Sequence, residues 1–172
     1  SAISLTPTEA TAAKRYDLMH AVNGRATFLC SQAAFPLMKE HGGHIVMMSP
    51  PLSMNPRWFA PHLAYTMSKY QMSFCVLGLS AEWKQYGIAV NALWPKTIIA
   101  TSAIEFNFPP ELMQKARHKN IVSDALMALI AKDSKVVTGQ FYLDQEILEE
   151  EGVSDFSAYA IDPNAELFLD LY

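Results

Sequence analysis

The chain has 172 residues, of which 51% are hydrophobic, and this is enough to build one sizeable core in a single domain. Its formal net charge is −4 and its lysines and arginines are scattered singly, so no basic face is predicted for nucleic acid. No apolar run reaches the length of a membrane span and no secretory signal opens the chain, so we expect no membrane span. Cys30 and Cys75 lie among apolar residues, which predicts buried free thiols and a reducing, cytoplasmic location.

The first half of the chain predicts a helix, a strand and a second helix. The segment from Thr6 to Glu9 has the pattern of a capping box and predicts the start of a long helix. Apolar residues at three-to-four spacing then predict one apolar stripe along that helix: Tyr16, Met19, Val22, Ala26, Leu29 and Ala33. A wholly apolar strand at residues 45–48 is followed by a helix over about residues 62–86, closed by Gly87.

The second half continues the alternation of strands and helices. Residues 88–94 predict a strand that ends at Pro95, and residues 140–143 predict the last strand. Two helical stretches are expected between them, over about residues 111–119 and 123–132. Because strands alternate with helices, the sequence predicts an α/β fold with a parallel sheet.

The tail differs in charge from the rest of the chain. Residues 144–172 hold nine of the 17 acidic residues and no lysine or arginine. One interpretation is a solvated surface extension. The other is packing over the chain's own body or a neighbouring subunit, with four aromatic anchors: Phe156, Tyr159, Phe168 and Tyr172. We divide the chain into a domain of residues 1–143 and an acidic extension, residues 144–172, that packs on the same domain.

The active-site candidate lies on the second predicted helix. Tyr65 and Lys69 are four residues apart, so both side chains lie on one face of the helix. A neighbouring ammonium favours the charged form of a phenol, so Lys69 is expected to lower the pKa of Tyr65. A tyrosine tuned in this way can exchange a proton with a carbonyl or an alcohol oxygen.

Several ordered motifs resemble one family. Tyr65-Thr66-Met67-Ser68-Lys69 resembles the YxxxK signature of the short-chain dehydrogenase/reductases, and it follows a strand that ends in Ser49. Asn23 matches the family's helix asparagine, and the strand that leads to Pro95 matches the family's next strand. The segments SPPL, NPRWF, AVNALWPKT and GVSDFSAYAIDP are similar to the hydroxysteroid dehydrogenase-like subgroup.

The resemblance implies a Rossmann-type, doubly wound parallel sheet. The family's glycine-rich turn between the first strand and first helix is not found here, because Gly42-Gly43 follows a helix and precedes a strand. The family's Pro-Gly is also replaced by Pro95-Lys96. We therefore expect this chain to be the C-terminal portion of the domain, with the first strand-helix units missing.

The resemblance also implies an NAD(P)-dependent oxidoreductase that uses NADP or NAD. Tyr65 would be the general acid/base, Lys69 would bind the nicotinamide ribose, and Asn23 would fix a proton-relaying water. Ser49 would hold the substrate oxygen, with Ser53 as the alternative because the family's serine aligns with Pro50. Four further residues are expected to meet the cofactor: Pro95, Thr97, Ile98 and Thr101.

The remaining expectations concern partners. The substrate is expected to be a small hydrophobic, lipid-like alcohol or ketone, because apolar side chains flank the loop before Tyr65. No metal site is expected, since His41 and His44 have no third ligand nearby. Family members form homodimers or homotetramers through two long helices, which is expected here as well. The alternative to an enzyme is a non-catalytic fragment or interaction module that does not bind a cofactor.

Overall fold

A computed structural model describes residues 2–170, and the chain forms two compact units. The first unit contains residues 2–92 and 132–141, and the second contains residues 93–131 and 142–170. The four residues predicted to be catalytic all belong to the first unit. The segment that follows Pro95 belongs to the second.

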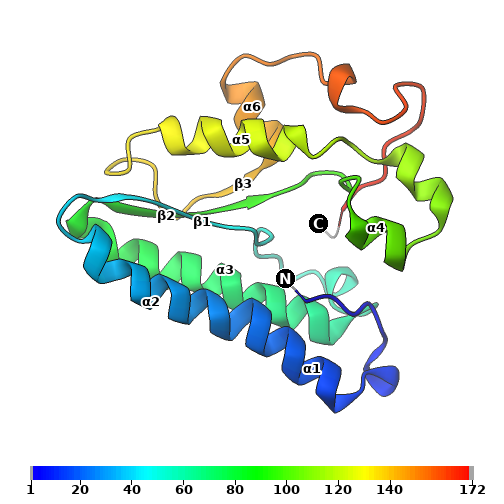
Figure 1. Ribbon diagram of the computed structural model, residues 1–172, viewed down its shortest axis with the longest axis horizontal. Coiled ribbons are helices and arrows are strands. Elements are labelled where there is room, and N and C mark those ends of the chain that lie inside the picture. The colour runs from blue at the N-terminus through cyan, green and yellow to red at the C-terminus, as the bar shows by residue number, and fades with distance from the viewer. Residues whose placement is uncertain (1, 171–172) are drawn as a thin grey trace. The chain divides into compact units, whose positions relative to one another are not determined.

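The first unit begins with a long helical rod (Figure 1). It consists of α1 (Ala13–Met19), a π-helical segment (His20–Arg25) and α2 (Ala26–Met38). The predicted start at Thr6 is wrong. The Thr6 hydroxyl contacts the Thr11 hydroxyl at 2.8 Å, and Thr11 Oγ1 donates to the carbonyl of Pro7, so these side chains close a separate turn before the helix.

The apolar stripe of this rod is not buried as one face. Met19 is only 1% exposed, whereas Tyr16, Val22 and Leu29 are 37%, 42% and 38% exposed. A π turn holds more residues than an α turn, so the regular three-to-four spacing is interrupted at residues 20–25. Cys30 lies in the exposed part, and the prediction that its thiol is buried is wrong.

A parallel pair of strands lies against the two long helices of this unit. β1 (Gly43–Met47) pairs with β2 (Ile88–Trp94), with Gly43 opposite Ile88 and Met47 opposite Ala92. The helix α3 (Leu63–Trp83) lies beside α2 on one face of these strands (Figure 1). Buried side chains of β1, α3 and β2 form the core: Met47, Val76, Leu79, Trp83, Ile88, Val90 and Ala92.

The boundaries of β2 agree with the prediction. A 3-10 turn (Lys84–Tyr86) extends α3, and Gly87 follows it in the left-handed conformation with φ +67°. Gly42 is also required, because a Cβ there would lie 2.6 Å from the Gly87 carbonyl oxygen. All residues of β2 are buried, as expected for a strand without polar alternation.

The second unit contains the remaining elements. In chain order they are α4 (Ser102–Asn107), a 3-10 turn (Pro110–Lys115), α5 (Asn120–Ala131), β3 (Phe141–Leu143), α6 (Asp144–Glu150) and a 3-10 turn (Ser157–Tyr159), with the first residue of β3 still in the first unit. The strand order of the sheet is β1-β2-β3. The helix expected near residue 111 is a 3-10 turn, and neither α4 nor α6 was predicted.

The acidic tail is held inside the second unit by helix packing and by backbone hydrogen bonds. α6 packs against α5. Further along, the backbone N–H of His118 donates to Tyr159 O at 2.7 Å, and Ile161 N–H donates to Ala116 O at 3.0 Å. The Phe168 N–H also donates to Lys115 O at 3.0 Å. The division of the chain at residue 143 stays a prediction.

Candidate active site

Tyr65 and Lys69 lie near the start of α3, and both are buried. Their exposed fractions are 6% and 4%. The Lys69 ammonium donates to the carbonyl oxygen of Met48 at 2.9 Å, directly after the last residue of β1. Burying an ammonium is costly without hydrogen bonds, so this contact fixes Lys69 at the end of the strand.

Asn23 lies in the π-helical segment and is 1% exposed. Its side-chain amide donates to Ser68 Oγ at 3.0 Å, and Ser68 Oγ donates to the carbonyl of Tyr65 at 2.7 Å. The same amide group also exchanges two hydrogen bonds with the backbone of Ala2, both at 2.8 Å. The backbone carbonyl oxygen of Asn23 accepts a hydrogen bond from Thr27 Oγ1 at 2.6 Å. Asn23 is therefore joined to the backbone of Tyr65 through Ser68.

Ser68 was not singled out in the sequence. It lies inside the YxxxK motif, between Tyr65 and Lys69, but its hydrogen-bond partner Asn23 is 45 residues away. The only sequence signal is a serine directly before Lys69, on the face of α3 that turns toward the first helix.

The two candidate serines have different environments. Ser49 is fully buried, and its hydroxyl has no hydrogen-bond partner within residues 2–170. Ser53 is half-buried, and its hydroxyl accepts from the backbone N–H of Asn55 at 3.2 Å. The Ser49 hydroxyl is therefore unused as donor and as acceptor, which is costly for a buried group, whereas the Ser53 hydroxyl already accepts one hydrogen bond.

The loop between β1 and α3 is hydrogen-bonded along one face of α3. Thr66 Oγ1 donates to Trp58 O at 2.7 Å, and Ser73 Oγ donates to Pro50 O at 2.7 Å. Between them, the Tyr70 hydroxyl donates to Ser53 O and accepts from Ser53 N–H, both at 3.0 Å. These positions follow helical spacing, so polar residues at that spacing in an otherwise apolar helix were the signal in the sequence. The loop is thereby fixed to the helix that carries Tyr65.

His62 completes this network at the start of α3. It is 7% exposed, and its Nδ1 lies 3.0 Å from Thr66 Oγ1. Because the Thr66 hydroxyl donates its proton to Trp58 O, His62 Nδ1 must carry a hydrogen and act as the donor. Desolvation lowers the pKa of His62, against a smaller opposing effect of a backbone hydrogen bond.

The lowered pKa of His62 predicts a loss of stability in mild acid. The unfolded protein takes up a proton near pH 6.5 and the folded protein only at lower pH. The stability from neutral His62 is therefore present above pH 6.5 and lost as the pH falls through the folded-state pKa. His62→Asn, which keeps a donor for Thr66 but does not titrate, is expected to lose less stability between pH 7 and pH 5. Urea unfolding at both pH values measures this.

Two further variants give this experiment its controls. His62→Phe removes the hydrogen bond and is expected to cost about 1 kcal/mol at pH 7. His41→Asn changes an exposed histidine of the same unit and shows whether the effect is specific to His62. If His62→Asn loses as much stability in acid as the unsubstituted protein, the role given to His62 is wrong.

A cavity of about 430 Å³ in the first unit is lined by residues of the first helical rod, of β1 and of α3. Asn23, Thr27 and Lys69 contribute polar groups to its lining, and methionines such as Met47 and Met72 contribute apolar surface. Two of the four predicted catalytic residues therefore line one cavity. Tyr65 and Ser49 are not among the residues that line it.

The four cofactor candidates that follow β2 in the chain lie in the second unit. Pro95, Thr97 and Ile98 are buried, and Thr101 is exposed directly before α4. The Thr97 hydroxyl is buried and has no hydrogen-bond partner in the described part of the chain. The backbone of Ile98 is already engaged, since its N–H donates to Phe168 O and its carbonyl accepts from Arg117 N–H, both at 3.0 Å.

Two kinds of feature are absent from residues 2–170. No group of three or more His, Cys, Asp or Glu side chains there is arranged to hold a metal ion. No helix in this range is both long and apolar enough to cross a membrane.

Comparison with known proteins identifies relatives over the whole chain. The family model described as enoyl-(acyl carrier protein) reductase matches residues 2–144. Hydroxysteroid dehydrogenase-like protein 2 from Homo sapiens is 48% identical over all of this chain, which covers 42% of that protein. The Xenopus laevis protein of the same name is 45% identical over all of this chain and is covered to 41%. The chain thus spans about two fifths of the length of these curated relatives.

Solved structures show the same relationship. A putative dehydrogenase from Xanthomonas campestris is 40% identical with a TM-score of 0.91, and this chain covers 62% of it. The landomycin C-6 ketoreductase LanV, solved with bound NADP and rabelomycin, is 25% identical with a TM-score of 0.64; the match covers 83% of this chain and 56% of LanV. With its parallel strands and flanking helices, the chain has part of a Rossmann-type α/β fold. It belongs to the short-chain dehydrogenase/reductase family, in the hydroxysteroid dehydrogenase-like subgroup.

Proposed function

We propose that this chain carries the catalytic residues of an NAD(P)-dependent oxidoreductase that acts on a hydrophobic alcohol or ketone. The observation that supports this most strongly is the pair Tyr65 and Lys69, buried one helical turn apart on α3. Lys69 is anchored to the end of β1, and Tyr65 is braced through Ser68 by Asn23. A buried tyrosine beside an ammonium is suited to general acid/base catalysis.

The four residues have distinct roles in this proposal. When bound, the nicotinamide supplies hydride chemistry at the substrate carbon. Tyr65 gives a proton to the carbonyl oxygen during reduction or takes one from the alcohol during oxidation. Lys69 holds the nicotinamide ribose and favours the tyrosinate, and Ser49 orients the substrate oxygen with its unused hydroxyl. Asn23 holds the relay water that supplies protons to Lys69.

The residues present fit the nicotinamide half of NADP or NAD. The Thr97 hydroxyl is a buried donor without a partner in the described chain, and Thr101 precedes the N-terminus of α4. Pro95 and Ile98 shape the same segment. Within residues 2–170, no glycine-rich turn leads from a strand into a helix, because β1 is followed by Ser49-Pro50, β2 by Pro95 and β3 directly by α6. The ends of these strands therefore do not offer the glycine-rich cradle in which this family holds the pyrophosphate.

The loop before Tyr65 supports an apolar, lipid-like substrate. Met54 is 92% exposed, and Phe59 packs edge-on against Tyr70 with ring centroids 5.2 Å apart. Arg57 lies over the ring of Trp58 at 4.4 Å, so the aromatic face is held by a cation–π contact. Unpaired Cys30 and Cys75 support a reducing location, which we propose is the cytoplasm.

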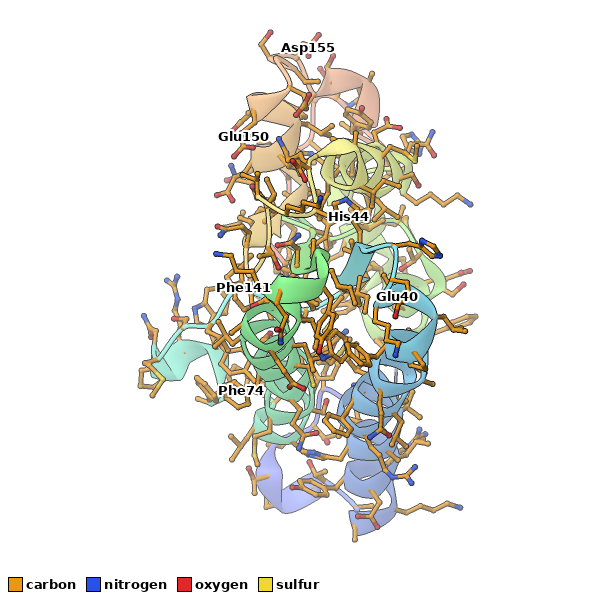
Figure 2. The ribbon with its side chains drawn as sticks, turned by 90° about the vertical axis from the view of Figure 1, so that its left-hand side faces the viewer. Glu40, His44, Phe74, Phe141, Glu150 and Asp155 are labelled. Atoms are coloured by element: carbon orange, nitrogen blue, oxygen red, sulfur yellow. The ribbon has the colours of Figure 1, made fainter. Side chains whose placement is uncertain are left out.

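We also propose that the protein self-associates through α2 and α3 as a homodimer or homotetramer. Large apolar side chains are exposed on both helices: Phe28 at 49%, Met67 at 40%, Phe74 at 58% and Leu77 at 47%. Figure 2 shows Phe74 on α3.

Phe74→Glu is expected to shift the protein to a smaller species in sedimentation velocity. An exposed change elsewhere, Val136→Glu, should not, and an unchanged mass for Phe74→Glu would contradict this interface.

The proposed function is tested first by intact mass and by titration with NADPH and NADH. A mass well above 19.2 kDa with saturable dinucleotide binding supports an enzyme of which this chain is part. A mass near 19.2 kDa without binding supports the alternative, a non-catalytic fragment or interaction module.

The choice between the two serines predicts a clear difference in activity. Ser49→Ala removes the unpartnered hydroxyl and is expected to lower turnover of a ketone at least tenfold. Ser53→Ala removes a hydroxyl that caps a turn and should change turnover less than threefold. Steady-state kinetics with a panel of aromatic and aliphatic ketones measures both. A larger effect of Ser53→Ala would reassign the role.

A further inference from the structure

The segment that follows β2 is held by hydrogen bonds to three other parts of the second unit. The Lys96 carbonyl accepts from Asp170 N–H at 3.2 Å, and Ile98 N–H donates to Phe168 O at 3.0 Å. The Ala100 N–H donates to Arg117 O at 2.8 Å. These contacts are backbone to backbone. The remaining contact comes from a side chain and involves the backbone N–H of Lys96.

That side chain is Asp144, the first residue of α6. It is fully buried. Its Oδ1 accepts from the backbone N–H of Lys96 at 2.9 Å and from that of Gln145 at 2.7 Å. Its Oδ2 has no hydrogen-bond partner in the described chain. A carboxylate therefore joins the end of β3 to the residue directly after Pro95.

The charge of Asp144 is only partly compensated. Desolvation raises the pKa of Asp144, opposed by its two backbone hydrogen bonds and by the charges of Arg117 and Lys96. Arg117 is 5% exposed, and its Nη2 donates to Gln145 Oε1 at 2.8 Å. Its Nε and Nη1 have no partner within residues 2–170. Buried, partly paired charges such as Asp144 and Arg117 contribute little to stability compared with apolar packing. The specific effect of Asp144 is the hydrogen bond that fixes the Lys96 amide.

We propose that Asp144 is a positioning residue for the dinucleotide: it holds the Lys96 N–H so that the segment from Pro95 to Thr101 keeps its binding conformation before the dinucleotide arrives. This rests on the proposed function, which assigns that segment to the cofactor. A preformed segment does not have to be ordered on binding, so the loss of the anchor weakens dinucleotide affinity.

The test is NADPH titration by fluorescence on the whole protein, at whatever length its intact mass shows. Asp144→Ala removes both hydrogen bonds and is expected to raise the Kd for NADPH about tenfold or more. Asp144→Asn retains an acceptor at Oδ1 and is expected to restore the Kd to within about threefold. The matched control is Asp155→Ala, since Asp155 also accepts from a backbone N–H, that of Ser157, but on the exposed surface of the same unit (Figure 2).

Melting temperatures separate positioning from a purely structural role. A lower melting temperature for Asp144→Ala with an unchanged Kd would overturn the inference, as would equal Kd changes for Asp144→Ala and Asp155→Ala. Absence of NADPH and NADH binding by the unsubstituted protein would instead overturn the proposed function, and the inference with it.

Amide hydrogen exchange of the unsubstituted protein gives a second test that needs no variant to fold. Backbone amides of Lys96, Ile98 and Ala100 are expected to be protected without dinucleotide, because all three donate hydrogen bonds. Protection that appears only after NADPH is added would contradict a preformed segment and overturn the inference.

Discussion

Tyr65→Phe is expected to lower turnover about a hundredfold to ten-thousandfold, the range typical of losing a general acid/base. The ring and its packing in the 6%-exposed site are retained, and only the phenolic oxygen is removed. Ser68 bonds the backbone carbonyl of Tyr65, so that contact also remains. The affinity for NADPH is therefore expected to stay within about threefold of the unsubstituted protein. Single-turnover reduction of a ketone and NADPH titration together measure both quantities.

Tyr70→Phe is the matched control for this variant. It removes a phenolic oxygen from a 7%-exposed tyrosine on the same helix, but that oxygen bonds the backbone of Ser53. We expect a looser loop, seen as a higher KM for an apolar ketone, with turnover changed less than threefold. Full turnover by Tyr65→Phe, or an equal loss in Tyr70→Phe, would contradict the role given to Tyr65.

The parts of the fold that were predicted correctly have strong local signals. Apart from Asn91, β2 is an apolar run between Gly87 and Pro95, and each boundary follows from the backbone preference of one residue. The first helix was predicted less well, because its π-helical segment depends on tertiary contacts such as those of Asn23 rather than on periodicity. α6 was missed because its acidic residues resembled a solvated tail, although its apolar residue Ile147 is fully buried.

The same distinction applies to the candidate site. Tyr65 and Lys69 could be predicted because their four-residue spacing is local. The hydroxyls that fix the loop have a helical spacing on α3, but their partners are backbone carbonyls 8 to 23 residues away, and the sequence does not show which carbonyl each hydroxyl meets. Asp144 is a similar case: its contact with Lys96 spans 48 residues.

Lys69→Met is expected to have the second largest effect, and it should differ in kind from that of Tyr65→Phe. The Lys69 ammonium donates a hydrogen bond to the backbone carbonyl of Met48, and a methionine side chain at position 69 has no donor to replace it. The carbonyl is left without this bond, which is expected to cost about 1 to 3 kcal/mol of stability. Loss of the charge beside Tyr65 and of the proposed ribose contact is expected to lower turnover at least a hundredfold and to raise the Kd for NADPH about tenfold.

Two substitutions distinguish these effects from a general loss of charge. Lys39→Met removes an exposed lysine whose ion pair with Glu40 has an N···O distance of 3.7 Å, and it should change neither turnover nor affinity. Lys69→Arg keeps the charge, but a planar guanidinium does not reproduce the point-like ammonium at a 4%-exposed site, so activity is expected to remain low. If Lys69→Met lowered stability but left turnover and NADPH affinity intact, Lys69 would serve only to tie α3 to the end of β1.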